Sequence, residues 1–177
     1  MRLNNTVLQF DEALGNHSAG LKLVYGDFSQ YDDDFKSAMD FIKVGEYDNA
    51  RHHFQLAYES VSQQDIYHNK YASYCGLLRL LSGDRSGIDL CRDVARNEYN
   101  DGDVFLNLAR AEWFLRERKS TVLALKKGLS IDQSHPGIAK MRKDIGLREK
   151  QPISFLKRDN ILNKTLGKMF RSSASFR

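Results

Sequence analysis

The chain has 177 residues, of which 41% are hydrophobic and 28% charged, so it has enough apolar material for one folded domain. No stretch approaches the ~18 consecutive apolar residues of a membrane-spanning helix, and the first residues lack the basic start and apolar run of a secretory signal. We therefore expect a cytoplasmic protein. Only two prolines occur among many strong helix formers, which favours helices over a sheet.

The formal charge of +4 is unevenly distributed along the chain. Residues 140–177 contain 11 Lys and Arg against 3 Asp and Glu, a net charge of +8. The remaining 16 basic and 20 acidic residues give residues 1–139 a net charge of −4. A basic C-terminal segment on a mildly acidic body is informative about binding partners rather than about the fold.

Residues 1–30 are weakly patterned and interrupted by glycines, so we expect a partly ordered arm there. From residue 31 onward, apolar residues recur at the spacing of amphipathic helices. Gly45 and Gly83 are expected to end the first and third helices, while Asp65 and Ser86 are expected to cap the third and fourth. The apolar positions predict seven helices, which span 35–42, 47–61, 66–81, 88–95, 104–115, 122–131 and 138–145.

These predicted helices are short and are joined by short connections, so neighbours should pack antiparallel. None can bury its apolar stripe alone, and stacking successive pairs would build a continuous core. The sequence therefore predicts an all-α fold made of packed helix pairs.

The segment Gly45-x-Tyr47-x-x-Ala50-x-x-x-Phe54-x-x-Ala57 combines a turn glycine with small and aromatic residues at fixed spacing. Small residues at Ala50 and Ala57 let two helices approach closely, and Phe54 fills the space between them. This segment resembles the turn and second helix of a tetratricopeptide repeat (TPR).

A second unit follows the same pattern with departures. It places Gly83 at the turn, Gly76 at the small position of its first helix and Ala95 at the last small position. Ile88 replaces the first alanine and Arg92 replaces the aromatic residue. We expect its second helix to be rotated or offset.

A third unit has Leu125 at the aromatic position and Gly128 at the last small position. It has Arg116 in place of the turn glycine and Glu112 where the family usually has an aromatic residue. The three turn positions lie 38 and 33 residues apart, which brackets the ~34 residues of the family repeat.

The resemblance covers residues 31–135 and implies a TPR-like helical-repeat solenoid of about three antiparallel helix pairs. The seventh predicted helix would be a C-terminal capping helix, with a polar outer face formed by Lys140, Arg142, Lys143 and Arg148. We expect three regions, which are an N-terminal arm (1–30), the solenoid with its cap (31–149) and a basic amphipathic tail (150–177).

Proteins similar to this family bind peptides along the concave face formed by the first helix of each pair. By repeat position, the expected partner-binding groove is apolar with a few cations, and its main residues are Phe35, Met39, Lys43, Lys70, Ser73, Leu77, Asn107, Arg110 and Trp113. A helix or an extended apolar segment would fit such a groove. The alternative is that apolar members such as Leu77, Leu81 and Phe114 simply belong to the core.

Some members of the family grip a partner's C-terminal carboxylates with Lys, Asn and Arg at fixed groove positions. Here those positions hold Phe35, Met39, Asp103 and Asn107, so this carboxylate clamp is absent. A co-chaperone role that depends on the clamp is therefore not expected.

The sequence gives no indication of catalysis. His52 and His53 are adjacent on a helix and point ~100° apart, so they are poorly placed to bind one metal ion. Cys75 and Cys91 lie in apolar helical patterns and are expected to be reduced core residues. No phosphate-binding glycine loop, nucleophile elbow or zinc-protease motif occurs. We expect no enzyme, no cofactor and no metal.

The tail contains a second amphipathic pattern. From residue 160, apolar residues recur at helical spacing, and the basic residues of the segment are Lys157, Arg158, Lys164, Lys168 and Arg171. A helix of this kind can lie on an anionic membrane, dock in a partner's groove or contact nucleic-acid phosphates. It can equally fold back and cover the end of the solenoid.

The leading hypothesis is a protein-protein interaction adaptor, scaffold or chaperone-like binder that uses the concave face for a protein or peptide partner. A homo-oligomer is a further option. The alternative is a peripheral membrane or nucleic-acid binder that acts through the basic tail.

Overall fold

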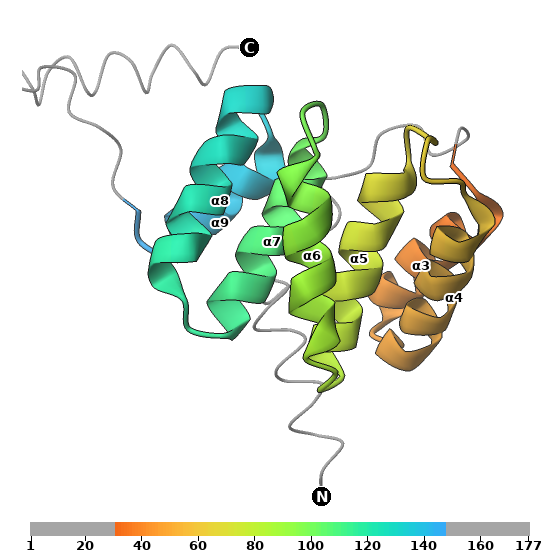
Figure 1. The fold of residues 1–177 in the computed structure, drawn as a ribbon. Helices are drawn as coiled ribbons and strands as arrows, with labels where there is room; N and C mark the ends of the chain where they lie inside the picture. Colours follow the sequence, from red (N-terminus) through yellow and green to blue (C-terminus); the bar gives the residue numbers. More distant parts are fainter. Residues whose placement is uncertain (1–30, 148–177) are drawn as a thin grey trace, which may run out of the picture. The chain divides into compact units, whose positions relative to one another are not determined.

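The computed structural model describes residues 31–147 (Figure 1). The chain divides into two compact units, Met1–Asp144 and Ile145–Arg177, and the described helices all lie in the first. Within the described residues there are seven α-helices and no strand, which confirms the all-helical expectation for this part of the chain. The helices are α3 (Asp33–Val44), α4 (Tyr47–Ser60), α5 (His68–Leu81), α6 (Ser86–Arg96), α7 (Gly102–Phe114), α8 (Arg118–Ile131) and α9 (Pro136–Asp144).

Neighbouring helices pack in pairs, as expected from their short connections. α3 packs against α4, α5 against α6, and α7 against α8 (Figure 1). α5 also contacts α4 and α7, so it joins the first pair to the third, and α9 contacts both α7 and α8. The predicted arm (1–30) and the whole of the predicted basic tail (150–177) lie outside the described residues.

The same turn follows the first helix of each pair. Its left-handed residue is Gly45 (φ 80°), Gly83 (φ 96°) or Arg116 (φ 64°). In each turn this residue donates its N–H to the carbonyl three residues earlier, and the next residue donates to the carbonyl five residues earlier. Gly45 and Gly83 lack the Cβ that disfavours this conformation, whereas Arg116 adopts it with a side chain.

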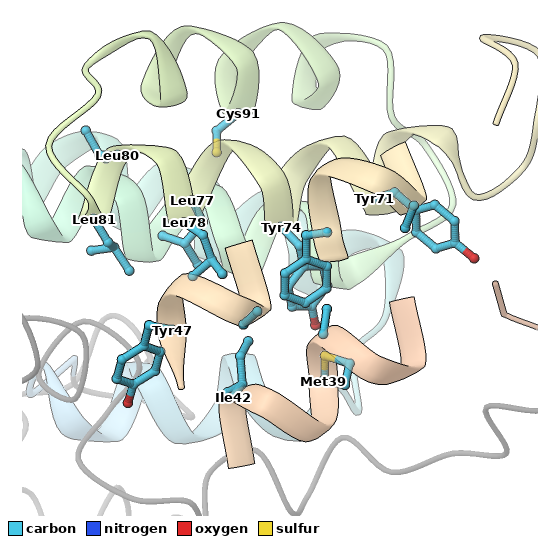
Figure 2. Packing of buried hydrophobic residues seen from close by; sticks show 14 of the residues in the cluster. Met39, Ile42, Tyr47, Tyr71, Tyr74, Leu77, Leu78, Leu80, Leu81 and Cys91 are labelled. Atoms are coloured by element: carbon cyan, nitrogen blue, oxygen red, sulfur yellow. The ribbon is translucent and has the colours of Figure 1, made fainter. Parts of the chain in front are cut away.

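The interface between α5 and α6 depends on a close backbone approach at Gly76. A Cβ at this position would lie 2.8 Å from both the Cys91 sulfur and the Gly87 carbonyl oxygen. Cys91 points from α6 towards α5 (Figure 2), and both Cys91 and Cys75 are free and buried. The predicted small position of the second unit is therefore a point of helix contact.

The larger core cluster joins α3, α4 and α5, where aromatic rings pack against one another. The rings of Phe35 and Tyr71 stack with centroids 4.7 Å apart, and those of Phe54 and Tyr74 stack at 5.0 Å. Figure 2 shows Tyr74 from α5 near Met39 of α3 in this region. Burial of these rings and of the surrounding aliphatic side chains stabilises the packing of the first two pairs.

Two predicted caps differ in detail from the structure. α5 begins at His68 rather than at Ile66, which is 82% exposed, because residues before it form a turn in which the Asp65 carboxylate accepts the Tyr67 N–H. At the start of α6, Ser86 is the predicted capping residue, but the capping hydrogen bond comes from Asp84, whose carboxylate accepts the Ser86 N–H. Each aspartate accepts the N–H two residues later, which belongs to the residue just before α5 in one case and to the first residue of α6 in the other.

Between residues 31 and 147, no helix is both long enough and apolar enough to cross a membrane.

Replacing Arg116 by glycine should raise the free energy of unfolding by about 0.5–1 kcal/mol, because glycine adopts left-handed backbone without the Cβ penalty. Urea unfolding of the two proteins measures this difference. Lys126→Gly, at an exposed position inside α8, is the control and should lower stability by about 1 kcal/mol. A loss of stability in Arg116→Gly would contradict the argument.

Candidate functional site

The predicted groove residues fall into two groups. Phe35, Met39 and Leu77 are at most 2% exposed and belong to the main core cluster, so their side chains are not available to a partner. Ser73, Asn107 and Arg110 are also buried, whereas Lys43 is exposed and Lys70 and Trp113 are partly buried. The structure therefore replaces much of the expected apolar groove with packed core and buried polar groups.

A row of buried polar side chains runs between α5 and α7. The Asn107 amide nitrogen donates to the Ser73 hydroxyl at 3.0 Å, and the Arg110 guanidinium donates to the Asn107 carbonyl oxygen at 3.1 Å. We call Ser73, Asn107 and Arg110 the α5–α7 polar row. Packing alone does not explain polar side chains here, because apolar residues of similar size would bury with no desolvation penalty.

Arg110 is the least compensated member of this row. Its side chain carries five N–H donors, yet within the described residues it makes one hydrogen bond and no ion pair, although the residue is only 6% exposed. Burial lowers the pKa of its guanidinium, and the nearby Tyr74 and Asp103 oppose this shift only partly. Buried charges are normally paired, so Arg110 is an exception that calls for an explanation.

Lys70 lies beside the row but is fully paired. Its ammonium group lies 3.1 Å from an Asp101 oxygen, 3.0 Å from an Asp103 oxygen and 3.1 Å from the Tyr31 hydroxyl. Burial opposes its charged form, but Asp103 and Asp101 raise the pKa of Lys70 well above its ordinary value. Lys70 is therefore a structural cation that ties α5 to the start of α7.

Asp103 extends this network to the segment before α9. Its second oxygen lies 3.1 Å from the Nε2 atom of His135, and both side chains are about nine-tenths buried. Burial acts to raise the pKa of Asp103, but the His135 hydrogen bond and the Lys70 charge outweigh it and hold this pKa at about 2. His135 in turn accepts the Ile138 N–H through its Nδ1 atom at 3.3 Å.

Sequence reasoning missed the buried carboxylate of Glu98. One of its oxygens accepts the N–H groups of Tyr99, Asn100 and Asp101, and the other accepts the Asn69 amide from α5. This arrangement fixes the loop that delivers Asp101 to Lys70. A Glu in a polar loop between two helices gives no sequence signal of burial, because its partners are either backbone groups or distant in the chain.

Two departures from the repeat pattern are partners in the structure. The Arg92 guanidinium forms a fork with the Glu112 carboxylate, with nitrogen–oxygen distances of 2.8 and 3.0 Å. Glu112 is 3% exposed, so its charge depends on this contact. An ion pair thus joins α6 to α7 where the resemblance suggests aromatic side chains.

The histidines and cysteines do not form a reactive centre in this part of the chain. His52 is exposed, and the Nδ1 atom of His53 lies 2.7 Å from the Asp34 carboxylate. Burial raises the pKa of both Cys75 and Cys91, which disfavours the thiolate. Among residues 31–147, no group of three or more His, Cys, Asp and Glu side chains is placed to hold a metal ion.

Comparisons of the chain with family models, with curated proteins and with solved structures gave no significant match.

Asp103→Asn should lower the free energy of unfolding at neutral pH by about 2–3 kcal/mol, because it removes a carboxylate from a buried ion pair. The pKa of Asp103 is depressed in the folded state, so its contribution is present above the ordinary value of 3.8 and is lost as the pH falls towards about 2. Urea unfolding between pH 7 and pH 2 should show the two proteins converging in stability.

Burial raises the pKa of the neighbouring Asp101, so its contribution to stability changes with pH in the opposite direction. Asp101 is present in both proteins, so the comparison of wild type with Asp103→Asn isolates the contribution of Asp103. Asp93→Asn, which alters an exposed ion pair with Arg96, is the control and should change stability by less than about 1 kcal/mol. A stability difference between wild type and Asp103→Asn that does not shrink in acid would contradict the assignment.

Proposed function

We propose that this protein is an interaction module of the TPR type, in which three helix pairs form a short solenoid capped by α9. It would act as an adaptor, scaffold or chaperone-like binder for a segment of another protein. The repeated left-handed turn at Gly45, Gly83 and Arg116, with the same hydrogen bonds each time, supports a repeated unit. The order of pairwise contacts from α3 to α9 supports the stacking.

The observation that carries this proposal is the incompletely paired charge of Arg110 in the α5–α7 polar row. Keeping a guanidinium in a buried place with one hydrogen bond lowers stability, so it is best explained by a ligand that completes its pairing. Guanidinium groups bind carboxylates through two parallel hydrogen bonds. We therefore expect the partner segment to place an Asp, a Glu or a chain terminus at Arg110.

This interaction differs from the groove expected from the sequence. Phe35, Met39 and Leu77 contribute packing, and Lys70 is occupied by Asp101 and Asp103. Specificity on this face would then depend on Arg110 and Asn107 rather than on an apolar stripe. Arg110 is only 6% exposed, so a partner that binds it would have to displace the side chains that now cover it.

Arg110→Met should abolish capture of the partner while leaving the thermal unfolding midpoint unchanged or higher, because methionine fills similar volume without a buried charge. The measurement is a quantitative pull-down from the native cell, compared with wild type and accompanied by thermal unfolding of each protein. Arg51→Met, at an exposed position on α4, is the matched control and should capture the same proteins as wild type. Equal capture by Arg110→Met would reject this site.

The alternative function as a peripheral membrane or nucleic-acid binder is favoured by one observation, the net charge of +8 in residues 140–177. Most of this segment lies outside the described residues, so the support comes from its sequence alone. Juxtaposed basic and apolar residues can bind anionic surfaces with ~1 kcal/mol per cation.

Replacing the tail cations Lys157, Arg158, Lys164, Lys168 and Arg171 by glutamine in the full chain tests this alternative. If the tail is the functional element, binding to phosphatidylserine vesicles or to RNA should fall by more than about tenfold. Cosedimentation and filter binding measure the two ligands. Binding that survives these substitutions would exclude the tail, and Arg110→Met should not affect it.

A further inference from the structure

A hollow lies on a different part of the fold from the α5–α7 polar row, between α6 and α8, with α7 as its floor. α7 lies between these two helices in Figure 1. The hollow is a cavity of about 280 Å³, and its apolar lining comes from Ala95 of α6, Phe105 and Leu108 of α7, and Leu123 and Ala124 of α8. We call it the α6–α8 groove. None of the residues proposed above to bind a partner lines it.

The sequence departures of the second and third units help to explain why this groove is not filled. Arg92, which replaces an aromatic residue, extends to Glu112 in place of packing as an apolar side chain. Ala95 and Ala124 also line the groove, and each contributes only a methyl group as its side chain. In the first unit, by contrast, Phe54 occupies the corresponding position and is 0% exposed.

An exposed apolar residue and a row of cations border the groove. α8 contains four basic residues and no acidic residue. Lys119, Leu123 and Lys127 follow one another at intervals of four, so they lie along one face of the helix. Leu123 is 68% exposed, which is unusual for a large apolar side chain between two charged residues.

Positive charges outnumber negative ones around this groove. Arg92, Arg96 and Lys127 line it. Arg92 pairs with Glu112 and Arg96 pairs with Asp93, whereas no carboxylate among the described residues pairs with Lys127. Lys127 donates to the Ala95 carbonyl at 3.3 Å and lies over the Phe105 ring at 4.9 Å, so it stays close to the opening. An acidic partner would therefore be attracted to this position.

We propose that the α6–α8 groove binds an acidic segment of a partner protein, which inserts one bulky apolar side chain between α6 and α8 and places carboxylates beside Lys119 and Lys127. This site is independent of Arg110 and goes beyond the function proposed above. A helical or extended segment with a leucine or phenylalanine flanked by Asp and Glu has the required chemistry.

The size and lining of the groove favour a protein side chain over other ligands. Its volume of about 280 Å³ lies at the lower end of the ~300–1,000 Å³ typical of small-molecule pockets and is sufficient for one leucine or phenylalanine side chain. A lipid surface would use the cations of α8 but would leave the apolar hollow above Phe105 unfilled. The hollow and the cations together therefore indicate a single anchoring side chain with acidic neighbours.

The test uses the full chain and a short fluorescein-labelled peptide with a central phenylalanine flanked by Asp and Glu. Fluorescence anisotropy should show binding that weakens as salt is added, because the flanking contacts are between exposed charges. The double variant Leu123→Ser with Lys127→Glu should weaken binding by about tenfold or more. Its matched control is Leu56→Ser with Arg51→Glu on α4, which makes the same chemical changes away from the groove and should bind as wild type.

Two control peptides separate the contributions. Replacing the central phenylalanine by serine should lose most of the binding, and replacing the acids by lysine should abolish it. Because every variant keeps the same basic tail, a loss restricted to the α8 variant assigns binding to the groove. Arg110→Met should bind this peptide as wild type does, which distinguishes this site from the α5–α7 polar row.

Three results would overturn the proposal. They are no binding of the acidic peptide, equal binding by the α8 variant, and equal binding of the serine-substituted peptide. Vesicles that contain phosphatidylserine provide the remaining comparison. If the α8 substitutions abolish vesicle binding while the peptide does not bind, the face recognises lipid instead, and the proposal fails. Circular dichroism of both double variants confirms that each retains its helices.

Discussion

The ammonium group of Lys70 is mostly buried and requires carboxylate partners. This requirement accounts for the positions of several charged side chains around it. Its two carboxylate partners, Asp101 and Asp103, lie at the start of α7, so the second and third helix pairs are joined by charge as well as by apolar packing. Asp103 also contacts His135, which lies just before α9. Glu98 accepts the Asp101 N–H and so fixes the loop that contains Asp101. Because buried ions are destabilising when unpaired, these contacts have to form together.

The two proposed surfaces use charge in different ways. The α5–α7 polar row keeps Arg110 buried with one hydrogen bond among the described residues, so a ligand there would gain strong, directional hydrogen bonds but would have to displace the side chains that cover it. The α6–α8 groove has exposed cations around an apolar hollow, which favours rapid, salt-sensitive encounter and a weaker anchored contact. One protein with both would suit a role that brings two partners together.

Features that depend on local spacing followed directly from the sequence. Glycine at Gly45 marked a left-handed turn, and apolar spacing located the helices because both signals lie within a few residues of one another. Lys70 and Asp103 are 33 positions apart, and the pattern of one helix says nothing about a charge on another. The repeat position of Met39 predicts that it lines the groove, but a repeat position does not specify which neighbouring helix covers the side chain. The apolar spacing includes Ile66 in a helix because an aspartate that caps a helix and one that closes a turn look alike in sequence.

The fork between Arg92 and Glu112 couples two positions that lie on different helices. Each residue alone departs from the TPR pattern that the sequence resembles. Replacing Arg92 by an aromatic residue would leave the buried Glu112 charge unpaired, whereas the Arg92 side chain is 40% exposed and would stay solvated if Glu112 were replaced. The second and third helix pairs are therefore coupled at this contact, because Glu112 of α7 keeps its buried charge compensated only while Arg92 of α6 reaches it.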